Sequence, residues 1–214
     1  DEAGCLKRAR HRAMDENRMN ASFSEQDALL EWVNSCDCVA RKCDSFMQLR
    51  DGVAISAILY DIDNRVFDLH PIDHPGMSVL ECKTNLDKIV NAIILYHDQE
   101  KGWTLESNIP IDPIFDANDP GSLVLIVRWV ITTILFSSKK THYISTILSL
   151  SPQTQMCLQC IIEAVMNSFP LDDENSASLS EMHSLVEDSI LSTDSVRYRR
   201  DSLDDNGAID AHDP

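Results

Sequence analysis

The stretch DGVAISAILYDID, residues 51–63, decides the fold, because it carries the pattern of one amphipathic helix. Asp51 stands just before the apolar residues, where an aspartate side chain accepts hydrogen bonds from the free N–H groups of a helix start. The apolar residues recur at intervals of three and four, which is the spacing of one helix face: Val53, Ile55, Ile58, Leu59 and Ile62. The stretch therefore predicts a helix from Asp51 to Asp63 that buries a broad face.

Further helices are predicted on both sides of this stretch. Toward the N-terminus, Ser24 has the features of an N-cap with Asp27 three residues later, and Trp32 is expected to anchor the core. Toward the C-terminus, the spacing predicts helices over 79–98, 119–136, 141–150 and 151–169, whereas 36–44 and 102–116 are expected to be loops. No stretch shows a convincing strand pattern, so the expected fold class is all-α.

The most apolar run of the chain, Leu123–Phe136, is expected to be a buried central helix. It follows Asp119-Pro120, which we read as an N-cap with a proline at the first helical position, where the missing N–H costs nothing. The run spans 14 residues and contains Arg128, whereas a membrane span needs about 20 apolar residues. Membrane insertion is therefore not expected.

Composition and charge narrow the classes of partner. The 214 residues are 43% hydrophobic and 6% aromatic and include six glycines, which favours helices over a β-sandwich. The net charge is −17, and residues 171–214 alone carry 12 Asp and Glu against three Arg. An acidic chain has no general attraction for nucleic acid or anionic lipid, so neither is expected as a partner. We predict a flexible arm over 1–22, one helical domain over 23–170 and an acidic, mostly disordered linker over 171–214.

No constellation of catalytic or metal-binding side chains is recognisable. His70 and His74 lie among aspartates in a predicted loop, where they are expected to be ordinary polar residues. No glycine-rich phosphate loop and no nucleophile motif is present. The cysteines number seven, which favours reduced thiols, and two groups of them lack the further ligands of a zinc site: Cys36, Cys38 and Cys43, and Cys157 and Cys160. We therefore expect no enzyme activity, no metal and no cofactor.

The two ends of the chain carry short charged motifs. Residues 7–12, KRARHR, are expected to belong to a solvated arm. Near the other end, Arg199-Arg200-Asp201-Ser202 has the arrangement that basophilic kinases favour, which makes Ser202 a candidate phosphosite. Phosphorylation there would add negative charge to a segment that is already acidic.

The predicted helix over 151–169 has more apolar surface than a fold needs. One stripe at helical spacing is a sufficient core face: Leu158, Ile161, Val165 and Phe169. A second stripe lies beside it and is long, flexible and half apolar: Gln155, Gln159, Ile162 and Met166. This second stripe either widens the core face or forms one wall of a groove for a partner helix. Periodicity alone favours the wider core face.

Four stretches in order resemble the N-terminal Hook domain of the Hook family of dynein adaptors. They are LLEWV (29–33), LRDGVAISAILYDIDNRVF (49–67), NLDKIVNAIILYH (85–97), and the segment from Asn118-Asp119-Pro120 through YISTILSLSPQTQ (143–155). The Girdin/Daple branch shares this domain, but DGVAISAIL and NDP look closer to Hook proper. The resemblance implies a calponin-homology-like helical bundle with one additional C-terminal helix.

The resemblance also implies a partner and a site. In the family the additional helix helps to grip an amphipathic helix of the dynein light intermediate chain. By position, Gln155 and Ile162 match family contact residues, and Gln159 falls where the family often has Met, which lowers the apolar burial at the groove centre. Met166 extends this stripe by periodicity alone. The resemblance thus reverses the preference that periodicity gives and favours a binding surface.

The family context adds expectations about assembly and location. The family continues into a coiled coil that contacts dynein and dynactin and through which full-length relatives dimerise, so the isolated domain is expected to be monomeric. It acts in the cytoplasm on the microtubule cytoskeleton, with the centrosome and the nuclear envelope among its sites. The alternative function is direct microtubule binding through a basic patch: Arg41, Lys42, Arg50, Lys139 and Lys140. The net charge of −8 over residues 1–170 opposes that alternative.

Overall fold

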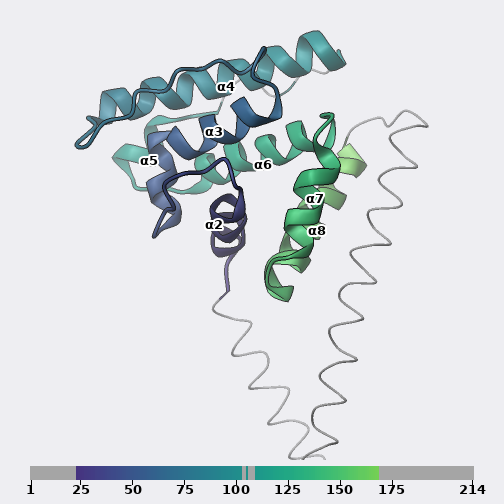
Figure 1. Cartoon of the computed structure of the whole chain (residues 1–214). Helices are drawn as coiled ribbons and strands as arrows, with labels where there is room; N and C mark the ends of the chain where they lie inside the picture. The colour runs from purple at the N-terminus through teal and green to yellow at the C-terminus, as the bar shows by residue number, and fades with distance from the viewer. Residues whose placement is uncertain (1–22, 103–104, 106–108, 169–214) are drawn as a thin grey trace, which may run out of the picture. The chain divides into compact units, whose positions relative to one another are not determined.

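The described part of the chain is built from helices (Figure 1). The computed structural model describes residues 23–102, 105 and 109–168, and all of them belong to a compact unit that covers Asp1–Phe169. The elements are α2 (Glu25–Ser35), η1 (Phe46–Asp51), α3 (Val53–Ile62), α4 (Val79–Lys101), α5 (Asp112–Asp116), α6 (Gly121–Leu135), α7 (Lys140–Leu148) and α8 (Pro152–Ser168). No strand occurs among these residues, and the all-α expectation is confirmed. The arm over 1–22, the linker over 171–214 and Ser202 lie outside the described residues.

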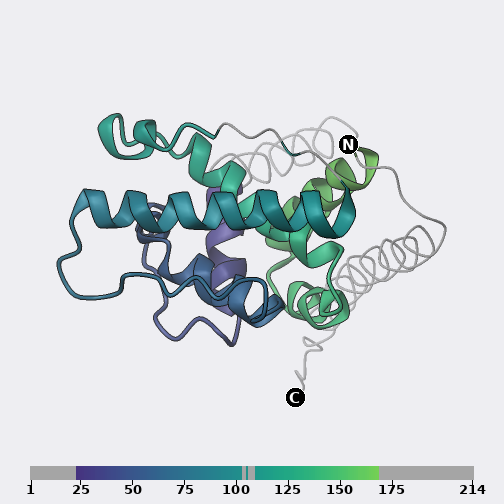
Figure 2. The ribbon, with the colours of Figure 1, turned by 90° about the horizontal axis from the view of Figure 1, so that it is seen from above.

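Helix α6 is the central helix, as its composition predicts. It contacts every other described element, and α4 crosses the domain as its longest helix (Figures 1 and 2). The two threonines of α6 are buried, and their hydroxyls donate to backbone carbonyls one turn earlier, Thr132 to Arg128 and Thr133 to Trp129. Because these polar groups are satisfied inside the helix, α6 can be surrounded by apolar neighbours at little cost.

The described part of the chain contains no single helix with both the length and the apolar composition to cross a membrane. Helices α6 and α7 reach that length only when taken together, and the chain bends by 120° between them.

Two helices begin with reciprocal capping boxes. At the start of α2, the Asp27 N–H donates to Ser24 Oγ and the Ser24 N–H donates to Asp27 Oδ2, at 3.2 and 2.8 Å, as the sequence predicts. Ser78 and Glu81 repeat this arrangement at α4. Each box satisfies two N–H groups that the helix itself leaves without partners. Both helices therefore begin at defined residues.

The start of α3 differs by two residues from the prediction. The segment Phe46–Asp51 forms the 3₁₀ helix η1, which was not expected, and Gly52 follows it with φ of 77°. Helix α3 therefore begins at Val53 rather than Asp51, although Asp51 Oδ1 accepts the Val53 N–H at 2.9 Å. A Cβ at Gly52 would lie 2.9 Å from Asn85 Cβ, so α4 packs against this turn at a distance that only glycine allows.

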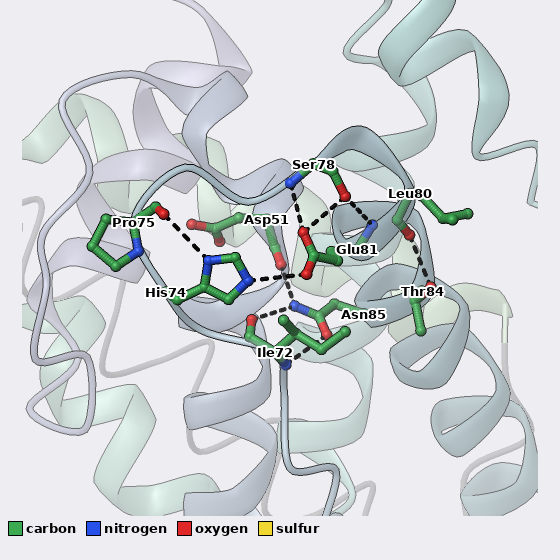
Figure 3. Close-up of polar contacts among 9 residues, drawn as sticks. All are labelled: Asp51, Ile72, His74, Pro75, Ser78, Leu80, Glu81, Thr84 and Asn85. Atoms are coloured by element: carbon green, nitrogen blue, oxygen red, sulfur yellow. Dashed lines mark hydrogen bonds and ion pairs between the residues drawn. The ribbon is translucent and has the colours of Figure 1, made fainter.

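Asn85 joins three segments at this turn (Figure 3). Its side-chain amide donates to the carbonyls of Asp51 and Ile72 at 2.8 and 2.9 Å, and its Oδ1 accepts the Ile72 N–H at 2.9 Å. The side chain is buried, and its three bonds satisfy backbone groups that water would otherwise have to satisfy, two in the loop over 63–78 and one at Asp51. The asparagine of NLDKIV is therefore a structural residue that holds this loop and the η1–α3 turn to α4.

Two histidines of the predicted polar loop lie beside carboxylates. His74 Nε2 is 2.9 Å from Glu81 Oε1, and His70 Nε2 is 3.1 Å from Asp68 Oδ1. The hydrogen bond from the Ser78 N–H lowers the pKa of Glu81 most, the hydrogen bond with His74 lowers it further, and together they bring it to about 2. Glu81 in turn raises the pKa of His74 above its ordinary value. This pair closes the loop over the first turn of α4 (Figure 3).

Three other boundaries also correct the sequence-based prediction. The expected loop over 102–116 contains α5. Pro113 lies in its first turn, where proline is tolerated, and the cations of Arg50 and Lys83 both contact the ring of Phe115. Helix α6 begins at Gly121, one residue after Pro120, and the Asp119 carboxylate accepts the Gly121 N–H. Helix α7 covers Lys140–Leu148 rather than 141–150.

Candidate functional site

The N-terminus of α8 is anchored to α2 by one carboxylate. Glu31 accepts hydrogen bonds from the Ser151 N–H at 3.0 Å, from Ser151 Oγ at 2.9 Å and from Thr154 Oγ1. Partial burial would raise the pKa of this carboxyl, but hydrogen bonds from Thr154 and Ser151 outweigh it and hold the pKa below its ordinary value. The negative charge also faces the positive end of the α8 dipole. Glu31 therefore fixes where α8 starts.

We expect Glu31→Gln to lower the free energy of unfolding by about 1.5–3 kcal/mol, the range for hydrogen bonds to a charged group. Because the folded-state pKa is depressed, this contribution is present above the ordinary pKa of about 4.3 and fades as pH falls toward the lower folded value. Urea unfolding of both proteins from neutral to acid pH measures it. An Asp87→Asn variant, at an exposed carboxylate on α4, is the control. A difference that stayed constant with pH would contradict this role.

Gln155 holds the corner between α7 and α8. Its Nε2 donates to the carbonyls of Leu148 and Leu150, at 3.0 and 2.9 Å, and the residue is only 6% exposed. Leu148 is the last residue of α7, where the helix has no internal donors left, and Leu150 lies in the connection to α8. The predicted contact residue Gln155 is therefore a side-chain cap of α7 in this structure, and α7 and α8 lie side by side (Figure 1).

The other three predicted residues lie on the same face of α8 but differ in exposure. Ile162 is 7% exposed and belongs to the core. Gln159 and Met166 are half-buried, and Gln159 Nε2 donates to Glu163 Oε1 at 2.9 Å. The second stripe thus has a buried part, Gln155 and Ile162, and an accessible part, Gln159 and Met166. The accessible part is what a partner helix can reach without displacing the core.

A cleft of about 690 Å³ lies along another side of α8, which sequence analysis did not foresee. Its wall on α8 is made of small and medium side chains, and α6 supplies larger ones. Its lining includes Leu125, Trp129, Cys157, Ile161, Ala164 and Val165. Val165, which was predicted to lie in the core, is only half-buried here. The small side chains on this side of α8 are a sequence signal for a loosely filled interface.

A bidentate ion pair borders this cleft. Arg128 Nε and Nη2 lie 2.6 and 2.8 Å from the two carboxylate oxygens of Glu25. This fork geometry fixes both side chains and joins the first turn of α2 to the middle of α6. The bond to Glu25 raises the pKa of Arg128 further, so the charge persists at any physiological pH.

The thiols and histidines show no arrangement for metal binding within the described residues. No group of three His, Cys, Asp or Glu side chains in those residues has metal-binding geometry. The six cysteines that the structure describes are free thiols. Burial raises the pKa of Cys36 most, the neighbouring Cys38 thiol raises it further, and the pKa reaches about 12. Burial also raises the pKa of Cys38 and Cys43. The three thiols therefore stay protonated.

Comparison with known proteins gives consistent matches. The model of the HOOK domain family matches residues 24–165. Protein Hook homolog 1 of Homo sapiens is 24% identical over 162 residues, which cover 73% of this chain and 22% of that protein. Protein hook homolog of Dictyostelium discoideum is 22% identical over 167 residues, which cover 77% of this chain and 23% of that protein. The chain therefore spans less than a quarter of the length of these relatives.

A solved structure shows the same fold. The solution structure of the conserved domain of mouse HOOK1 protein matches this chain with a TM-score of 0.62 at 22% identity. The match covers 71% of this chain and 96% of the mouse domain. The expected calponin-homology-like helical bundle with an additional C-terminal helix is confirmed.

Proposed function

Because this chain belongs to the HOOK domain family, we propose that its helical domain is an adaptor module that binds the amphipathic helix of a dynein light intermediate chain. The family is one of cargo and organelle adaptors. In this proposal dynein and dynactin are also contacted through a coiled coil outside this chain. The place of action is then the microtubule cytoskeleton of the cytoplasm, including the centrosome and the nuclear envelope.

The observation that carries the proposal is the half-exposed margin of the second stripe, at Gln159 and Met166. This margin lies on a helix that α2, α6 and α7 all contact and that Glu31 and Gln155 fix at its start. A partner helix with apolar residues at intervals of three and four fits such a margin, because both surfaces repeat at the same period. Gln155 and Ile162 are buried and support this margin from inside the domain.

Gln159→Met tests this surface as a gain of affinity. A thioether in place of the amide adds roughly 1 kcal/mol of apolar burial on binding, which corresponds to about a fivefold lower Kd. The measurement is a calorimetric titration of the 214-residue chain with a peptide that spans the light-intermediate-chain helix.

Gln153→Met is the matched control, because Gln153 is exposed on the same helix and points about a third of a turn away from Gln159. It should leave the Kd unchanged. The proposal fails if neither the natural chain nor Gln159→Met binds the peptide. The assignment of the surface fails if both substitutions change the Kd equally.

Direct microtubule binding receives less support from the geometry. Two cations of the candidate patch are paired with acids, Arg41 with Asp51 at 2.9 Å and Lys139 with Asp61 at 2.8 Å. The guanidinium of Arg50 lies over the Phe115 ring. Charges engaged in this way project a weaker positive field toward an acidic filament. We therefore keep helix binding as the proposed function.

A further inference from the structure

A second hollow, of about 500 Å³, lies along α3 and shares no lining residue with the cleft beside α8. Its volume is in the range of small-ligand and side-chain pockets. One side is the face of α3 that carries Val53, Ser56, Ala57 and Tyr60, and the other is the chain over 67–71. We call this hollow the α3 recess. Its walls are mainly apolar carbon, since the α3 side chains face a leucine, a proline and a phenylalanine ring.

The α3 recess contains a buried hydroxyl without a partner. Ser56 is 3% exposed, and its Oγ has no hydrogen-bond partner among the described residues. Buried hydroxyls are nearly always hydrogen-bonded, so this one requires an explanation. Ser56 lines the recess, so rotation of its side chain to another staggered rotamer is the movement that would present Oγ to a ligand there.

The chain that forms the opposite wall is held in a strained conformation. His70, which lines the recess, has φ of +42°, a left-handed value that residues other than glycine adopt at a cost. Pro71 follows directly and restricts the same residue further. Strain of this kind persists where the surrounding structure enforces it, and it is concentrated at binding sites.

The rim of the α3 recess combines an aromatic ring with an acid. Tyr60 is 51% exposed although it is a large side chain. The Asp68 side chain is 54% exposed, and its ion-pair partner His70 carries a positive charge only when protonated. Asp61, the other acid of the recess, is already bonded to Lys139 and Tyr143 at 2.8 Å each. Asp68 is therefore the acid available to an incoming cation.

We propose that the α3 recess is a docking site for a partner peptide that inserts a tyrosine or tryptophan side chain next to a lysine or arginine. The aromatic ring fills the space between the apolar walls. Its hydroxyl or indole N–H hydrogen-bonds to the Ser56 hydroxyl, which has no partner among the described residues. The neighbouring cation pairs with Asp68 at the rim. This site is separate from the stripe on α8 and does not rest on the function proposed for that helix.

Three capped dipeptides test the two parts of this recognition on the 214-residue chain. The probes are acetyl-Tyr-Arg-amide, acetyl-Phe-Arg-amide and acetyl-Tyr-Glu-amide, titrated by NMR while the backbone amides of α3 and of residues 67–71 are followed. The Tyr-Arg probe should bind about threefold more tightly than either of the others, the scale of one hydrogen bond or one surface ion pair. Shifts that do not occur at α3 and residues 67–71 would overturn the proposal.

Variants assign each preference to one side chain. Ser56→Ala should remove the preference for Tyr over Phe and leave that for Arg over Glu, and Asp68→Asn should do the reverse. Ala57→Trp fills the recess and should abolish binding of all three probes, while circular dichroism shows a folded domain. A Tyr preference that survives in Ser56→Ala, or an Arg preference that survives in Asp68→Asn, would overturn the proposal. Ser56→Ala and Asp68→Asn are conservative substitutions, so the result does not depend on whether Ala57→Trp folds.

Discussion

Gly52→Ala is expected to destabilise the domain by about 2–5 kcal/mol, through backbone strain and overpacking together. Gly52 has φ of 77°, which costs an alanine roughly 1–2 kcal/mol. The new methyl group would also lie 2.9 Å from Asn85 Cβ and 3.1 Å from Ile89 Cδ1, closer than carbon atoms approach without displacement. Since both neighbours are buried on α4, the displacement would reach the core.

Gly76→Ala is the matched control for this substitution. Gly76 has φ of 79°, nearly the same value, but no atom beyond its own chain neighbours lies within 4 Å of the position its Cβ would take. Gly76→Ala should lower the free energy of unfolding through backbone strain alone, by about 1–2 kcal/mol. Urea unfolding of the three proteins measures both values, and the melting temperature should fall by about 2–4 °C per kcal/mol. Equal losses at the two glycines would contradict the close packing of α4 on the η1–α3 turn.

The residues that carry the family resemblance are structural ones. Asp51 accepts a hydrogen bond at the start of α3, Gly52 allows the close approach of α4, and Asn85 bonds to two segments at once. None of them lines the cleft beside α8. A match in these motifs therefore identifies the fold, whereas the proposed binding of a partner helix rests on α8 and in particular on the half-buried Gln159.

Helices with strong local signals could be predicted from the sequence. Ser24 and Asp27 form the capping box that their spacing indicates, and Trp32 is buried in the core. The elements that were missed have short or ambiguous patterns. Helix η1 has six residues, too few to show a period, and α5 contains a proline and depends on contacts of Phe115 with cations from two other elements.

Which residues of the second stripe are buried could not be predicted, because burial depends on neighbours that are distant in sequence. Periodicity shows that Gln155, Gln159, Ile162 and Met166 share one face. It does not show that the end of α7 supplies two carbonyls to Gln155, or that Ile162 is enclosed within the core. The cleft beside α8 was missed for the same reason, since its width depends on how α6 and α8 pack.

Gln159→Asp is expected to weaken binding of the light-intermediate-chain helix by about a hundredfold or more. A carboxylate at the centre of an apolar contact loses its hydration without gaining a partner, a cost of about 3 kcal/mol. The same substitution at Ile162 would not separate binding from folding, because that side chain belongs to the core. Gln159 is half-buried, so the domain tolerates the change.

Gln159→Asp should lower the stability of the domain by less than it lowers the binding free energy. Gln159→Asp removes the hydrogen bond to Glu163 and places two carboxylates four residues apart on α8, which costs roughly 0.5 kcal/mol of helix stability. Gln153→Asp makes the identical substitution at an exposed position of the same helix, so it controls for added negative charge. Titration of both variants with the peptide should show the loss only for Gln159→Asp. If Gln159→Asp binds as the natural chain does while its circular dichroism shows a folded domain, the partner helix does not lie on this stripe.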